Sequence, residues 1–167
     1  MNKDYFNVLS TVDCSNKIEK KNGLSYLSWA WAWNEFKKRY PMSYYTVYET
    51  PEGSLVWRDP VGGHVKTGVT VVWIEGDVTH ELEHIEYLPI MDFRNKAIPY
   101  DNISSMDTNK TVQRSLTKAV ARHGLGLFIY AGEDIPEEDT ASNAELISSI
   151  NDVISKKVEK MTADEKK

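Results

Sequence analysis

A long antiparallel hairpin is the strongest constraint that this sequence places on its fold. Residues 64–75 alternate between two sets of side chains, which is the period of a strand with one buried face. Gly76-Asp77 then predicts a two-residue turn, and residues 78–88 return as a second strand that ends at a proline. A sequence of this kind favours an antiparallel sheet.

Two shorter strands are expected before the hairpin. Residues 43–50 are rich in tyrosine, threonine and valine, and a turn signal follows at 51–53. Residues 54–59 are expected to pair back across that turn. The predicted fold class is therefore α+β, with an antiparallel β-meander that has one face free to pack against helices.

An aromatic helix is predicted over residues 25–40, with Ser25 as its N-cap. Trp29 and Trp33 fall on its apolar stripe, whereas Trp31 lies about 200° from Trp29 on the polar side. An aromatic side chain in that position needs a partner. The sequence leaves three candidates open: a neighbouring segment, a subunit interface or a stacked base.

A second helix carries a stripe of positive charge. Residues 108–132 contain four basic residues at intervals of four and no acidic residue. Each four-residue step advances about 40° on a helix, so the cations form one slowly winding stripe opposite an apolar side. Asp107 or Thr108 is expected to cap this helix, and Gly124 to end it. The stripe suits a polyanion, and it consists of Lys110, Arg114, Lys118 and Arg122.

The charge of the chain is unevenly distributed. The net charge is −5, and residues 133–167 supply all of it, with 5 basic and 10 acidic residues.

Residues 125–131 are expected to form a short buried strand or extended segment. A capping box at 142–145 predicts a last helix with an apolar stripe, which docks on the domain, self-associates or binds a partner. The predicted regions are a polar arm (1–22), a core domain (23–136), and an acidic linker with an amphipathic helix (137–167).

Composition indicates a soluble chain from a reducing compartment. Cys14 is the only cysteine, so no disulfide can form within the chain, and a cytoplasmic location is expected. No apolar run reaches the length of a membrane span, and the first residues lack the apolar core of a signal peptide.

One motif has the form of a metal site. His80 and His84 belong to an H-E-x-x-H pattern, which binds zinc in metalloproteases when it lies on a helix. Here the pattern follows the predicted hairpin turn, and in a strand the two imidazoles would lie about 13 Å apart. No paired acid and base, nucleophile or phosphate-binding loop is indicated elsewhere. We therefore expect a binding protein with no cofactor, and not an enzyme.

Several blocks of sequence together resemble one family. The chain is similar, over roughly residues 23–136, to the phage and prophage single-strand annealing proteins of the Sak type, which are related to the eukaryotic annealing protein RAD fifty-two. The blocks are Tyr26-Leu27-Ser28-Trp29-Ala30 with Trp33, Met91-Asp92-Phe93-Arg94-Asn95-Lys96-Ala97-Ile98, Gln113-Arg114-Ser115-Leu116-Thr117-Lys118-Ala119, and the segment 123–134.

The resemblance implies a β-meander with a long helix packed across it, assembled into rings or filaments. It also implies that single-stranded DNA lies in a basic groove and that complementary strands anneal without ATP, in phage recombination and repair within a bacterial host cell. Lys118 occupies the matching position of the family's basic cluster, and Arg114 and Arg122 flank it.

Residue chemistry agrees with that expectation, since single strands are held by a cationic track and aromatic surfaces. The candidates for stacking bases are Phe93, Tyr100 and Trp31, and packing in the core is the alternative for Phe93 and Tyr100. The alternatives are a solvated helix face, an interaction module that binds an acidic protein, and a zinc-dependent hydrolase that uses His80, Glu81 and His84. A single-strand-binding protein or an exonuclease is a candidate partner of the tail. The predicted DNA-binding residues are Lys110, Arg114, Lys118, Arg122, Arg94, Lys96 and Tyr100.

Overall fold

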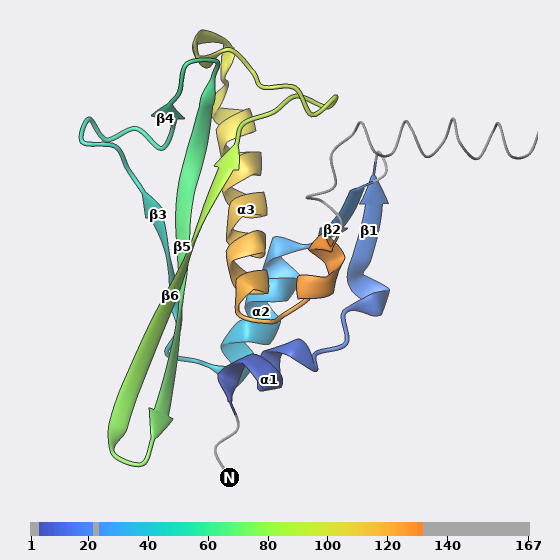
Figure 1. Cartoon of the computed structure of the whole chain (residues 1–167), viewed down its shortest axis with the longest axis vertical. Coiled ribbons are helices and arrows are strands. Elements are labelled where there is room, and N and C mark those ends of the chain that lie inside the picture. Colours follow the sequence, from blue (N-terminus) through green and yellow to red (C-terminus); the bar gives the residue numbers. More distant parts are fainter. Residues whose placement is uncertain (1–3, 22–23, 132–167) are drawn as a thin grey trace, which may run out of the picture. The chain divides into compact units, whose positions relative to one another are not determined.

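The predicted hairpin is the longest element of the sheet. In the computed structural model, which describes residues 4–21 and 24–131, β5 (Gly63–Glu75) pairs antiparallel with β6 (Val78–Pro89) (Figure 1). The pairing runs from His64↔Pro89 to Glu75↔Val78, so the turn is the predicted Gly76-Asp77. All described residues except Ala131 belong to one compact unit, Met1–Tyr130.

Two short strands flank β5 on its other side. β3 (Tyr44–Tyr48) pairs antiparallel with β5, as does β4 (Trp57–Arg58). The expectation that residues 54–59 pair with 43–50 is therefore wrong. The Asp59 carboxylate accepts the amides of Val61 and Gly62 at 2.9 and 2.7 Å, and this turn reverses the chain directly onto β5.

The described helices lie on one face of the sheet. α3 (Ser105–Arg122) packs along β5 and β6, and α2 (Trp29–Arg39) packs against α3 (Figure 1). The N-cap of α3 is Ser104, and Asp107 completes a capping box three residues later, so the predicted cap at Asp107 or Thr108 is wrong. The antiparallel sheet and its packed helices confirm the predicted α+β class.

The start of the chain is part of the core. α1 (Tyr5–Ser10) contributes the fully buried Leu9, and Cys14 is also buried. A short 3₁₀ helix, η1 (Ser15–Lys17), leads into β1 (Ile18–Lys21), which pairs with β2 (Leu24–Leu27). The interpretation of residues 1–22 as an arm outside the core is therefore wrong for its described part.

The aromatic helix begins later than predicted. Ser25 lies within β2, and Ser28 is the N-cap of α2, so the predicted cap at Ser25 is wrong. The Asn22-Gly23 dipeptide between β1 and β2 is a typical hairpin turn sequence, and it is the signal that distinguishes a strand from a helix here. Trp31 packs against the hydrophobic core, which identifies a neighbouring segment as its partner.

Two further 3₁₀ helices occur in the connecting segments. η2 (Tyr100–Asn102) precedes α3, and η3 (Leu127–Tyr130) follows it. The expected strand or extended segment at 125–131 is therefore wrong, because Gly124 and Gly126 have positive φ of 111° and 71°, which turn the chain tightly. The predicted C-terminal helix and the boundary at 136 lie outside the described residues. No helix of the described part is long and apolar enough to cross a membrane.

A buried histidine joins α3 to the sheet. His123 is fully buried and its Nε2 lies 2.8 Å from the Val69 carbonyl oxygen, so Nε2 carries the donated hydrogen. Its ring contacts the rings of Tyr5, Phe36 and His84. Burial lowers the pKa of His123 from 6.5 to about 4, because the charged form loses its hydration.

We expect this histidine to make the fold acid-sensitive. Because the folded pKa lies below the unfolded one, the unfolded chain binds the proton more tightly, and stability falls as pH drops from 6.5 towards 4. Between pH 7.5 and pH 5 this term amounts to about 2 kcal/mol. Urea unfolding at the two pH values should show that His123→Gln removes about this much of the decrease. Equal decreases in both proteins would contradict the assignment.

Candidate nucleic-acid interface

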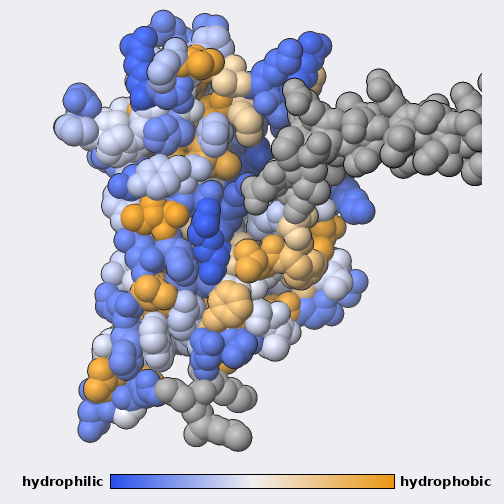
Figure 2. Space-filling view, viewed as in Figure 1, coloured by the Kyte–Doolittle hydropathy of each residue, from blue (hydrophilic) through white to orange (hydrophobic). Residues whose placement is uncertain are grey.

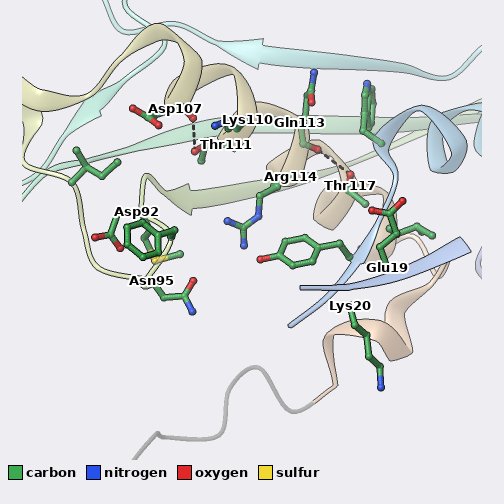
Figure 3. A pocket seen from close by; sticks show the side chains of 16 residues that line it. Glu19, Lys20, Asp92, Asn95, Asp107, Lys110, Thr111, Gln113, Arg114 and Thr117 are labelled. Atoms are coloured by element: carbon green, nitrogen blue, oxygen red, sulfur yellow. Dashed lines mark hydrogen bonds between the residues drawn. The ribbon is translucent and has the colours of Figure 1, made fainter. Parts of the chain in front are cut away.

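A groove of about 750 Å³ lies beside α3. One wall is α3 itself, the second is the β1–β2 hairpin, and the third is the connection that follows β6 (Figure 3). This connection is closed by an isolated bridge between Met91 and Ala97, and it turns at Asn95, which has a φ of 59°. Three segments that are far apart in the sequence therefore form a single concave surface.

Arg114 is the central cation of this groove. Its side chain is half-buried, and its guanidinium carbon lies 5.1 Å from the centre of the Tyr26 ring on β2. Among the residues that the structure describes, the Arg114 side chain forms no hydrogen bond or ion pair. A guanidinium has five N–H donors in a planar fork, so this arrangement presents several donors to an anion in the groove.

Further polar side chains line the same groove. Lys110 lies one turn before Arg114 and is exposed, and Lys20 comes from β1. Gln113 also lines the groove, and its backbone carbonyl accepts a hydrogen bond of 2.9 Å from the Thr117 hydroxyl (Figure 3). The groove thus offers both charged and neutral hydrogen-bonding groups.

Three carboxylates line the groove beside these three cations. Asp92 accepts the backbone amides of Arg94 and Lys96 at 2.8 and 3.0 Å, and Asp107 accepts hydrogen bonds from Ser104. Hydrogen bonds lower the pKa of both groups, chiefly that from the Lys96 amide for Asp92 and that from the Ser104 side chain for Asp107. These two carboxylates are therefore engaged by the loop and the helix cap. Glu19, on β1, is exposed.

The cationic stripe of α3 divides among three environments. Lys110 and Arg114 line the groove, whereas the Lys118 ammonium lies 5.3 Å from the Tyr130 ring of η3. Arg122 forms an ion pair with Glu86, a buried carboxylate of β6. The stripe winds through about 120° over its length, so its two ends face different neighbours. Of the four predicted cations, Lys110 and Arg114 therefore line the groove, whereas Lys118 and Arg122 lie outside its lining.

The other predicted contacts lie around the groove. Phe93 lines it and is 74% exposed, and the Arg94 guanidinium lies 5.0 Å from the Phe93 ring. Arg94 and Lys96 are exposed on the same connection, although neither lines the groove. Tyr100 lies outside the lining and has the Arg58 guanidinium 4.7 Å from its ring. The sequence did not indicate Tyr26, Asn95 or Gln113 as site residues, because their roles depend on contacts between distant segments.

The H-E-x-x-H pattern lies within β6, as its alternation predicts. His80 stacks on Trp73 at 5.1 Å between ring centroids, and His84 packs against His123 at 4.5 Å. The two histidines therefore contact different partners along a strand, which excludes the helical geometry of a metalloprotease zinc site.

One comparison with known proteins gives a match. A family model described as Sak Single Strand Annealing Protein matches residues 3–163. The searches of curated proteins and of solved structures found no significant match. The matched region includes all three walls of the groove and extends beyond the sequence blocks within residues 23–136. The chain belongs to the Sak family of single-strand annealing proteins.

Proposed function

We propose that this protein binds single-stranded DNA in the groove and anneals complementary strands without hydrolysing a nucleotide. The observation that carries the proposal is Arg114, a half-buried guanidinium that has no carboxylate partner among the described residues. A phosphate of the DNA backbone supplies the missing acceptor, because its oxygens match the planar donors of a guanidinium.

The other groups of the groove suit the remaining parts of a nucleotide. Lys20 and Lys110 provide two more charges for phosphates, and Phe93 at the rim provides an exposed ring for stacking a base. Contacts to the backbone do not use the pairing edges of the bases. A strand held in this way can therefore pair with its complement.

We further propose that several copies act together in phage recombination, as rings or filaments. Many weak sites on one assembly bind a long strand tightly, because each contact raises the effective concentration of the next. An acidic protein partner is the competing ligand for the same groove. Direct binding and annealing measurements separate the two.

Arg114→Ala should weaken binding to a labelled single-stranded oligonucleotide roughly tenfold or more, since a hydrogen-bonded charge contributes about 1.5–3 kcal/mol. Annealing of complementary oligonucleotides, followed by fluorescence without ATP, should slow in parallel. Lys17→Ala is the matched control, because Lys17 is exposed in η1 and outside the groove lining. Unchanged binding by Arg114→Ala would place the DNA elsewhere, and an inactive wild-type chain would refute annealing.

Tyr26 is expected to act by holding the Arg114 side chain in place. Tyr26→Phe keeps the ring and should bind DNA as the wild type does, whereas Tyr26→Leu removes the stacking surface and should weaken binding several-fold. Tyr26 lies on β2, so a substitution there could destabilise the β1–β2 hairpin. Urea unfolding of both variants checks that their folded states are as stable as that of the wild type. If Tyr26→Phe and Tyr26→Leu bound DNA with equal affinity, Tyr26 would not position Arg114.

The salt dependence of DNA binding should report how many phosphates the groove neutralises. Three cations line the groove, so the slope of log affinity against log salt should be near −2 per site for a single strand. Arg114→Ala should make that slope less steep by about 0.7. A slope that is unaffected by the substitution would show that Arg114 does not neutralise a phosphate.

A further inference from the structure

The connection that follows β6 contains a tight turn, residues 92–96, at one wall of the groove. Figure 3 shows Asp92 and Asn95 of this turn on one side of Arg114, and Glu19 of β1 on the other side. In Figure 2 the turn stands out at the upper right as a mainly hydrophilic projection. The turn therefore extends outwards beside the groove.

Backbone hydrogen bonds hold this turn at its tip and at its base. The Asp92 amide donates to the Lys96 carbonyl at 2.8 Å, and the Asn95 amide donates to the Asp92 carbonyl at 3.1 Å. Asn95 has a φ of 59°, in the left-handed region that asparagine tolerates better than most residues. At the base, the Ile98 amide donates to the carbonyl of the buried Ile90 at 3.1 Å, which fastens the turn to the core.

The Asp92 carboxylate closes the same turn from inside. One of its oxygens accepts the Arg94 amide at 2.8 Å and the Lys96 amide at 3.0 Å. The charge of the carboxylate makes such hydrogen bonds stronger than those between neutral groups. Phe93 lies between Asp92 and Arg94 along the chain, so these hydrogen bonds also fix the backbone from which the Phe93 ring projects.

Phe93 combines an exposed ring with neighbouring positive charge. It lines the groove and, at 74%, is the most exposed large hydrophobic residue in the described part of the chain. The Arg94 guanidinium lies 5.0 Å from the centre of the ring, and Lys96 is exposed two residues later. Because the turn is already ordered, covering this ring with a flat apolar surface costs little conformational entropy. A ring with cations beside it suits bases joined by phosphates.

We propose that Phe93 inserts between two successive bases of the bound strand, and that Asp92 is the positioning residue that holds the ring in place. This inference rests on the binding of single-stranded DNA proposed above and specifies how the strand lies in the groove. The ring contacts the faces of two bases, while Arg94 and Lys96 bind the phosphates beside the opened step. The pairing edges of the bases stay free, so each copy interrupts the base stack once without blocking annealing.

A single-stranded oligodeoxynucleotide with consecutive 2-aminopurines provides the test, because stacking between neighbouring bases quenches its fluorescence. Saturating full-length wild type should raise the fluorescence, since each inserted ring separates two bases. Phe93→Ala should weaken binding about tenfold and, at saturation, should give a much smaller rise. Phe128→Ala is the matched control, because Phe128 is 59% exposed and lies outside the groove lining. It should behave as the wild type in both measurements.

Two variants of Asp92 test its role separately from that of the ring. Asp92→Ala leaves the Arg94 and Lys96 amides without their acceptor, so the saturated complex should show a much smaller rise than the wild type. Asp92→Asn keeps a side-chain oxygen that can accept the same amides and should restore most of the rise. Urea unfolding checks that both variants are folded. A wild-type rise with folded Asp92→Ala would show that Asp92 does not position Phe93.

The outcomes distinguish failure of this inference from failure of the DNA-binding proposal. A wild type that binds the strand without a rise in fluorescence, or an equal rise with Phe93→Ala, would overturn insertion and leave binding in the groove intact. A wild type that does not bind the oligonucleotide would refute DNA binding itself. Arg114→Ala should weaken binding and still give the wild-type rise at saturation, because the turn and its ring are unchanged.

Discussion

The buried contact between α3 and β5 orients the rest of the site. Two polar bonds fix it: the hydroxyls of Thr67 and Ser115 lie 2.7 Å apart, and His123 bonds to the Val69 carbonyl at 2.8 Å. Both bonds are buried, and a rotation or a shift of the helix would leave their groups without partners at a cost of about 1–3 kcal/mol each. The two bonds lie about two turns apart on α3, so together they set its rotation and its position along the strand.

That orientation decides what the cations of α3 can do. Arg114 precedes the buried Ser115 and projects into the groove, whereas Arg122 precedes His123 and reaches Glu86 on β6. Residues of similar chemistry thus have different roles in one helix, since one cation lies against an aromatic ring and the other against a buried carboxylate. The charge relevant to a ligand is that of the groove, where Asp92 and Asp107 are already engaged by backbone and cap hydrogen bonds.

Local patterns predicted the elements whose reasons are local. The alternation of residues 64–88, the Gly76-Asp77 turn and the basic amphipathic helix were all recovered, and the strand interpretation of the H-E-x-x-H pattern followed from the same alternation. The misassigned elements, by contrast, depend on distant partners. Leu9 and Cys14 are buried because other segments cover them, and a polar stretch such as residues 1–22 gives little indication of that burial.

The amino-acid sequence by itself determined the α+β class, the long hairpin, the positions of the four cations along one helix, and the resemblance to Sak annealing proteins. These depend on residue order and periodicity, which are readable along a single chain. Only the tertiary structure decided that Tyr26 lies under Arg114, that Arg122 pairs with Glu86, and that Phe93 reaches the same groove as Lys110. Such pairings result from the packing of segments tens of residues apart, and side-chain spacing along one element does not specify which of its neighbours it will meet.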